Sequence, residues 1–245
     1  MDTEAQQTER DRSSRPDTTE DTSGTPGPEG RSRSALGRGV AWLPGGWVTL
    51  TLTLCLAFLL ALSTFVVRPF QIPSGSMEPA LRIGDRVLVN KLAYRFGSAP
   101  QRGDVVVFDG GGYFGDGDFI KRVVGVGGDR VVCCDEEGRI RVNGRSVDES
   151  GFLYPGDDAS TVPFDVVVPE GRLFLLGDHR SASSDSRDRL GSPGGGMVPA
   201  DDLIGRADAI AWPMDRARRL HRPDAYARVP SPASGAPRTT GGSHG

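Results

Sequence analysis

The fold is decided by a turn–strand unit that reads Leu81-Arg82-Ile83-Gly84-Asp85-Arg86-Val87-Leu88-Val89-Asn90-Lys91. Gly84-Asp85 is typical of a turn, and the β-branched residues Val87 and Val89 alternate behind it as they would along a strand. Similar units follow at short spacing, and helical periodicity is nearly absent among them. We therefore predict a mainly β domain over residues 68–214, built as an antiparallel sheet or a barrel-like set of packed sheets.

The other predicted strands lie between turns rich in Gly, Pro and Asp. They cover residues 105–108, 119–126, 130–133, 139–142, 145–147, 164–168, 173–176 and 203–212. Asn143-Gly144 favours a type I′ turn, which predicts a hairpin between two of them. Cys133 and Cys134 are adjacent in a strand, where side chains alternate between faces. A disulfide between neighbours is strained, so we favour two packed thiols over a disulfide, and the sequence leaves their redox state open. No cysteine spacing indicates a metal site, and we expect no metal and no cofactor.

Both ends of the chain have the composition of disordered segments. Residues 1–46 are rich in Asp, Glu, Thr, Ser, Pro, Gly and Arg, and cannot bury enough apolar surface to offset the entropy of ordering. From Pro213 onward Arg, Pro, Ala, Ser and Gly dominate, so we expect a mobile tail, residues 215–245, behind the β domain. The net charge of −3 gives no indication of a nucleic-acid partner.

An apolar run without any charge occupies residues 47–67. About 21 residues at ~1.5 Å rise give roughly 31 Å, the thickness of the hydrocarbon core of a bilayer. The alternative is a cleaved signal peptide, whose apolar core would be shorter, nearer the N-terminus and followed by a small-x-small site. We predict one transmembrane helix, whose orientation the flanking charges leave open.

A turn with two serines comes shortly after this run, in the stretch Gln71-Ile72-Pro73-Ser74-Gly75-Ser76-Met77-Glu78-Pro79-Ala80-Leu81. The prolines fix φ locally, and the glycine admits backbone geometry that other residues avoid. Such a stretch can hold a hydroxyl group on a rigid turn. A neighbouring base would make that hydroxyl a nucleophile.

Two residues are candidate bases for such a serine. His179 is the one histidine in the predicted β domain, and a Ser-His-Asp triad would use it. Lys121 is the alternative, if burial among Phe119, Ile120 and the valines that follow lowers the pKa of its amine from ~10.4. On a strand Lys121 and Arg122 face opposite ways, so one can point inward while the other pairs outside. The residues alone leave both bases open.

Four blocks, in order behind the apolar run, resemble the signature boxes of type I signal peptidases, also called leader peptidases. They are residues 71–79, 84–91, 121–129 and 177–187, with residues 102–108 fitting between the second and the third. The resemblance spans residues 67–212. It implies a membrane-bound serine endopeptidase of the Ser/Lys dyad type, which removes N-terminal signal peptides from secreted preproteins without a catalytic histidine.

Matched residue by residue, the resemblance implies a role for four side chains at the reacting centre. Ser76 would be the nucleophile and Lys121 the general base. The Ser74 hydroxyl and the Ser76 N–H would form the oxyanion hole. Ser183 would orient the lysine amine by a hydrogen bond.

Two further groups of residues match positions around the dyad. Asp185 and Arg187 would form a salt bridge behind the site, with Arg122 as an additional partner. The resemblance also implies shallow pockets that accept alanine-sized substrate side chains. Their lining would consist of Phe70, Ile72, Leu81, Val87, Val107 and Ile120. The preprotein would lie extended beside the serine turn and add main-chain hydrogen bonds as an extra strand.

The family resemblance also implies a location and partners. The chain would be a single-pass protein of the cell membrane, with its N-terminal tail cytoplasmic and its catalytic domain extracytoplasmic. Its partners would be preproteins that carry signal peptides, the lipid bilayer and the secretion translocon. Because the anchor and the serine turn are adjacent in sequence, they would bring the reacting groups and the substrate to one membrane interface.

The sequence departs from the family pattern at a few positions. His179 stands where asparagine is common, and Ser181-Ala182 replaces the more usual Asp-Asn. Neither change touches the dyad, and we interpret His179 as a structural residue. Residues 130–171 form a short region for the family, which indicates a reduced β subdomain.

Two rival hypotheses remain. A self-cleaving repressor on the same fold would need a DNA-binding helical domain, where this chain has an apolar run instead. A membrane-tethered binding domain without catalysis would not need Ser76, Lys121 and Ser183 together.

Overall fold

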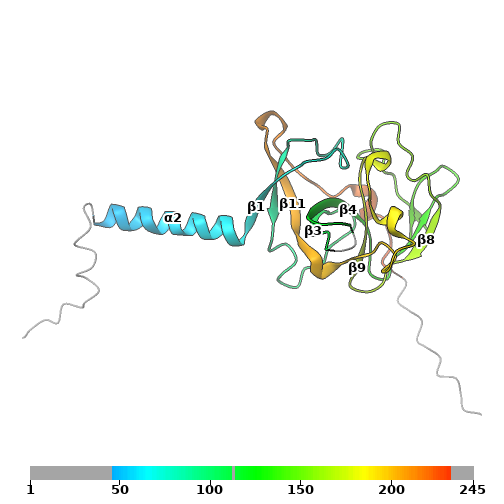
Figure 1. Ribbon diagram of the computed structural model, residues 1–245, viewed down its shortest axis with the longest axis horizontal. Coiled ribbons are helices and arrows are strands. Elements are labelled where there is room, and N and C mark those ends of the chain that lie inside the picture. Colours follow the sequence, from blue (N-terminus) through cyan, green and yellow to red (C-terminus); the bar gives the residue numbers. More distant parts are fainter. Residues whose placement is uncertain (1–45, 112–113, 233–245) are drawn as a thin grey trace, which may run out of the picture. The chain divides into compact units, whose positions relative to one another are not determined.

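The computed structural model describes residues 46–111 and 114–232, and Figure 1 shows their course. The chain divides into two compact units, residues 1–51 and 52–245. The first unit is described only from residue 46 onward. The disordered tail predicted for residues 1–46 therefore lies outside the described residues, apart from Gly46.

Helix α2 comprises Trp47–Phe65 and covers most of the apolar run that the sequence marks as a membrane span. It is shorter than the predicted 47–67, because Val67 already pairs with Asn90 as the first residue of strand β1. Among the described residues, no helix combines the length and the apolar character needed to cross a membrane. The transmembrane helix stays a prediction.

The second unit contains a larger antiparallel sheet. Its described strands follow the order β1-β2-β11-β3-β4-β9-β10, with β12 paired to β11. Their bounds are Val67–Gln71 (β1), Arg86–Asn90 (β2), Val105–Asp109 (β3), Asp118–Val126 (β4), Arg172–Leu176 (β9), Val198–Pro199 (β10), Leu203–Trp212 (β11) and Arg218–Arg219 (β12). The two ends of this path, β1 and β10, do not pair with each other, so the described strands form an open sheet rather than a closed barrel.

A smaller antiparallel sheet is formed by the chain between β4 and β9, in the order β7-β6-β5-β8. Its strands are Arg130–Cys133 (β5), Arg141–Val142 (β6), Arg145–Ser146 (β7) and Phe164–Val167 (β8). Asn143 and Gly144 have φ of 51° and 79°, the left-handed values of a type I′ turn, so the predicted hairpin is confirmed. The small β subdomain predicted at residues 130–171 is present.

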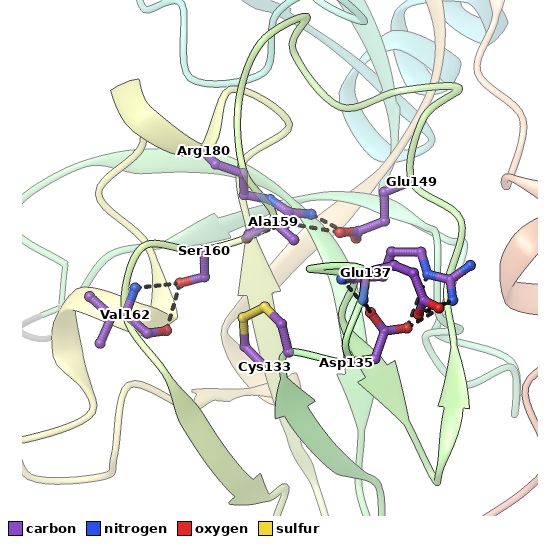
Figure 2. The surroundings of a disulfide bond; sticks show 10 residues. Cys133, Asp135, Glu137, Glu149, Ala159, Ser160, Val162 and Arg180 are labelled. Carbon is purple, nitrogen blue, oxygen red and sulfur yellow. Dashed lines mark hydrogen bonds and ion pairs between the residues drawn. A yellow bond between two sulfur atoms is a disulfide. The ribbon is translucent and has the colours of Figure 1, made fainter.

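Figure 2 shows a disulfide bond between Cys133 and Cys134, where the sequence predicts two packed thiols. That prediction assumes an extended strand across both residues, with their side chains on opposite faces. Strand β5 instead ends at Cys133, the peptide bond to Cys134 is cis, and the two Cα atoms lie 3.0 Å apart. The prediction was wrong because Cys134 is not part of the strand.

The segment after β11 is ordered, and the mobile tail predicted from Pro213 onward is wrong for residues 213–232. These residues form the 3-10 helix η4 (Met214–Arg216), strand β12 and helix α3 (Asp224–Ala227). The amino-acid composition of this segment did not predict these elements, because a few buried side chains hold the segment in place. Tyr226 and Val229 belong to the apolar core of the smaller sheet. Residues 233–245 lie outside the described residues.

Candidate active site

The serine turn, residues 72–81, connects β1 to β2 through a closed loop. Ile72 closes its base, since its N–H donates to Asp85 O at 2.8 Å and its carbonyl accepts from Gly84 N–H at 2.9 Å. The side chains of Met77 and Leu81 are fully buried and hold the turn in the core of the larger sheet. The hydrogen bonds of Ile72 and the two buried side chains thereby fix the backbone around the two serines.

Ser76 and Lys121 meet inside the protein. Lys121, on strand β4, donates from Nζ to Ser76 Oγ at 2.9 Å, and the two residues are 4% and 5% exposed. Burial lowers the pKa of the Lys121 amine to about 8, while the negative charges of Asp185 and Asp178 oppose this shift. The neutral amine, which is the form that can accept a proton, is therefore far more populated than in an exposed lysine.

Two candidate hydrogen-bond donors lie close to Ser76 Oγ. Ser74 is exposed, and its Oγ lies 3.4 Å from Ser76 Oγ. In the described part of the chain, the Ser76 N–H donates to no other group. Both donors are thus available to a ligand that binds against Ser76.

Ser183 lies close to the serine turn, but the hydrogen bond predicted from it to the lysine amine is not formed. Its Oγ is the one buried side-chain polar atom among the described residues that has no hydrogen-bond partner. A Cβ added at Gly177 would overlap Ser183 Oγ and Ser76 O. The absent side chain of Gly177 therefore lets Ser183 and the backbone of Ser76 approach each other, and the orienting role of Ser183 stays a prediction.

Asp185 and Arg187 pair behind the site, and Arg122 does not join them. The Asp185 carboxylate accepts hydrogen bonds from Arg187 Nε at 2.8 Å and Nη2 at 2.9 Å. Arg122 instead donates to both carboxylate oxygens of Asp178 at 2.7 and 2.6 Å, and to Gly103 O.

The predicted partner of Arg122 was therefore wrong, and the physical reason is strand pairing. Arg122 pairs in register with Leu176 at the end of β9, which places the arginine beside the segment that follows β9. Sequence reasoning missed Asp178 as its partner. One feature of the sequence could have indicated this partner: Asp178 lies in the block of residues 177–187, which also contains Ser183, Asp185 and Arg187.

His179 supports the serine turn through its backbone and its ring. Its N–H donates to Ser76 O at 3.1 Å, and its Nδ1 lies 3.3 Å from Gly75 O. The imidazole stacks on the Tyr154 ring, with 3.7 Å between centroids and 9° between planes. These contacts fit a structural residue that holds the turn.

The residues predicted to line the substrate pockets belong to one apolar cluster together with Met77. The cluster includes Ile72, Leu81, Val87, Val107 and Ile120, all buried, with the partly buried Phe70 packed against them. They lie among the elements that carry Ser76 and Lys121. Their contact with substrate stays a prediction.

The strand that carries Lys121 has an open edge. Strand β4 pairs with β3 over residues 118–122 and with β9 over residues 122–126. On the β9 side, residues 118–121 therefore have no strand partner among the described residues. An extended peptide could pair with this edge directly beside the dyad.

Comparisons with known proteins place this geometry in context. Residues 45–212 match the family model described as signal peptidase, peptidase S26. Signal peptidase I of Mycobacterium tuberculosis is 38% identical over 201 residues, which cover 62% of this chain and 67% of the relative. Signal peptidase I of Pseudomonas fluorescens is 36% identical over 210 residues, covering 67% and 72%. A crystal structure of a signal peptidase I from Enterococcus faecalis aligns with a TM-score of 0.35 at 25% identity, covering 44% of this chain and 97% of that one.

Proposed function

This chain belongs to the signal peptidase family of peptidase S26, serine endopeptidases that cleave signal peptides, and we propose that Ser76 and Lys121 form its catalytic dyad. The observation that carries the proposal is the buried 2.9 Å contact between Lys121 Nζ and Ser76 Oγ. A lysine amine whose pKa is lowered to about 8 by burial can act as a general base near neutral pH.

In the reacting form the Lys121 amine is neutral, and the Ser76 hydroxyl donates the hydrogen bond to it. As Ser76 Oγ bonds to the scissile carbonyl carbon, its proton passes to Lys121 Nζ. The ammonium returns a proton to the leaving amine, the new N-terminus of the mature protein, as the C–N bond breaks. Water then attacks the remaining ester and gives a proton to Lys121. Lys121 returns this proton to Ser76 Oγ as the ester C–O bond breaks, and the signal peptide leaves with a free carboxylate.

The developing oxyanion would be held by the Ser74 hydroxyl and the Ser76 N–H. The support for this assignment is that both donors lie beside Ser76 Oγ and neither is committed to a stronger internal partner. Such a donor typically contributes ~3 kcal/mol to the transition state.

The substrate is a preprotein that carries a signal peptide, and we propose how it binds. The segment around the scissile bond would lie extended between the serine turn and the open edge of β4 at residues 118–121. Small side chains before the cut would contact the apolar cluster that contains Ile72 and Ile120. Larger side chains would clash with this packed surface.

The family is typically membrane-bound, and we propose a single-pass arrangement for this chain. Residues 47–67 would anchor it, with the N-terminal tail in the cytoplasm and the catalytic domain outside. The lipid bilayer and the secretion translocon would be its neighbours. The support is the uncharged apolar run, which ends at residue 67, with only strand β1 between it and the serine turn.

The test uses the full chain in detergent with a radiolabelled preprotein. Ser76→Ala and Lys121→Ala should each abolish processing, whereas His179→Ala should retain most of it, because the histidine only supports the turn. Processing at the original rate by Ser76→Ala would refute the dyad. Loss of processing with His179→Ala but not with Lys121→Ala would instead favour a triad based on the histidine.

A further inference from the structure

Residues 213–232, called the strap below, lie beyond the part of the chain that matches the family model, which ends at residue 212. The strap starts from the larger sheet, where β12 pairs with β11 and Leu220 N–H donates to Asp208 O at 2.9 Å. It ends at the hairpin of the smaller sheet, where Asn143 Nδ2 donates to Pro230 O at 3.0 Å. It thus connects the two sheets across the segment that precedes β3.

Three polar contacts hold the strap between these two ends. Arg222 Nη1 donates to Gln101 Oε1 at 2.8 Å, and its guanidinium forms an ion pair with the buried carboxylate of Asp104. Arg102 Nη1 donates to Val229 O at 3.5 Å. The strap therefore forms polar contacts with the rest of the domain along its length, and not at its two ends alone.

Tyr226 is the side chain that the strap inserts most deeply. It is 4% exposed and stacks on Phe152, with 6.0 Å between ring centroids. Its hydroxyl donates to Glu149 Oε1 at 3.3 Å. Burial raises the pKa of this hydroxyl well above its usual value, and the Glu149 charge adds to the effect, so Tyr226 stays a neutral donor.

Beneath Tyr226 lie four charged residues, each 5% exposed or less. Glu149 accepts two hydrogen bonds from Arg180, at 2.9 and 2.7 Å, and Figure 2 shows this pair. Arg122 forms the second pair with Asp178, and its guanidinium lies 4.5 Å from the centre of the Phe152 ring. Phe152 therefore lies against both Arg122 and Tyr226.

Both ion pairs connect to the reacting groups. Arg122 follows Lys121 directly on β4. Asp178 precedes His179, whose N–H holds the carbonyl of Ser76, and Arg180 Nε donates to Gly177 O at 2.9 Å. The charged groups that act on the Lys121 amine are Asp185 and Asp178, and Asp178 is neutralised by Arg122.

We propose that the strap is a positioning element for the Ser76–Lys121 pair and that Tyr226 is its positioning residue. This inference rests on the proposed dyad. Buried ion pairs keep their geometry only when water is excluded and every polar group is paired. Tyr226 packs its ring on Phe152, which lies against Arg122, and donates from its hydroxyl to Glu149. Without it, water reaches the pairs, and the strand with Lys121 and the segment that supports Ser76 lose their fixed spacing.

The test compares Tyr226→Ala, Tyr226→Phe and Val229→Ala in the full chain with one preprotein. Val229 is the matched control, because it is buried in the same strap and cluster but its aliphatic side chain cannot form a hydrogen bond to the charged pairs. Tyr226→Ala should lower kcat about tenfold or more with KM nearly unchanged, since misplaced reacting groups slow chemistry rather than binding. Its pH–rate limb should move to higher pH, because water entry weakens the burial that lowers the pKa of Lys121.

Tyr226→Phe should process the preprotein at nearly the original rate, because the ring still packs on Phe152 and Glu149 Oε1 still accepts from Arg180 Nη2. Val229→Ala should keep the original pH profile. A folded Tyr226→Ala variant with unchanged kcat and pH profile would overturn the inference, and so would equal effects of Tyr226→Ala and Val229→Ala. If Tyr226→Ala does not fold, Glu149→Gln replaces it in the test. An unchanged pH profile in Glu149→Gln would also overturn the inference.

The same assay separates this inference from the proposed dyad. Processing by Ser76→Ala or Lys121→Ala would show that the dyad is wrong. If those two variants are inactive and Tyr226→Ala behaves like the original protein, the dyad stands and the strap inference fails alone.

Discussion

Lys121 Nζ lies 2.9 Å from Ser76 Oγ, although 45 positions separate the two residues in the chain. Strand β4 provides the lysine and the turn after β1 provides the serine, so only the folded sheet brings them together. Both residues are almost fully buried, and burial is what lowers the pKa of the amine. If the two residues form the proposed dyad, the 2.9 Å distance and the lowered pKa of the amine together determine the pH at which the serine can react.

The first expected outcome concerns the pH dependence of processing. Because the proposed mechanism needs the neutral amine to accept the proton of Ser76, kcat/KM should rise with pH, reach half its maximum near pH 8, where the pKa of Lys121 lies, and level off above it. Lys121→Arg should be inactive at every pH up to 10, since a guanidinium stays protonated. Initial rates from pH 5 to pH 10 check this, and a rising limb that disappears in His179→Ala would contradict it.

The second expected outcome concerns stability, since a buried lysine with a lowered pKa destabilises the folded state. The unfolded chain binds the proton up to about pH 10.5 and the folded chain only up to about pH 8. The free energy of unfolding is therefore lowered by the full amount, roughly 3 kcal/mol, below pH 8. This loss disappears as the pH rises from 8 towards 10.5. Lys121→Met should raise the free energy of unfolding at pH 7, with a gain that shrinks between pH 8 and 10.5.

Denaturant unfolding of both proteins in the same detergent, from pH 6 to pH 10.5, measures this difference. Other groups titrate equally in the two proteins, so the difference isolates Lys121. A gain that stays constant over the whole range would show that the lysine is not desolvated.

The third expected outcome concerns Ser183, whose buried hydroxyl has no partner in the described part of the chain. Removing an unpaired hydroxyl should leave the thermal transition almost unchanged, because no hydrogen bond is lost. If Ser183 orients the lysine amine during the reaction, Ser183→Ala should still lower kcat about tenfold or more. Ser184→Ala, an exposed neighbour, is the control. Equal kcat values for both variants would remove Ser183 from the mechanism.

The sequence is informative about the site where residue type alone carries the chemistry. The two serines in a proline-flanked turn and one of only two lysines in the chain could be identified from their order and their neighbours. The hairpin at Asn143-Gly144 could be predicted because its turn is encoded locally. These features need no knowledge of distant partners.

Long-range partners could not be predicted in the same way. Tyr226 is ordered through Glu149, which lies 77 positions away, and the composition around Tyr226 is that of a mobile tail. Arg122 pairs with Asp178 across two strands whose pairing the sequence does not state. The disulfide at Cys133-Cys134 depends on where β5 ends, and strand boundaries are set by the sheet rather than by the cysteines themselves.

The last expected outcome concerns the buried pair Arg122–Asp178, which lies directly behind Lys121. Arg122→Met leaves the Asp178 carboxylate buried without its partner, and breaking such a pair costs about 3–5 kcal/mol of stability. Asp178→Asn in the Arg122→Met background removes the orphaned charge, so the double variant should recover part of that loss.

Arg130–Asp165, an exposed pair with similar two-fold hydrogen bonding, is the matched control, and Arg130→Met should change stability little. Thermal and denaturant unfolding give the stability of the original protein, Arg122→Met, the double variant and Arg130→Met. A similar loss in Arg122→Met and Arg130→Met would mean that burial contributes nothing, and then the pair could not be what fixes the strand beneath the lysine.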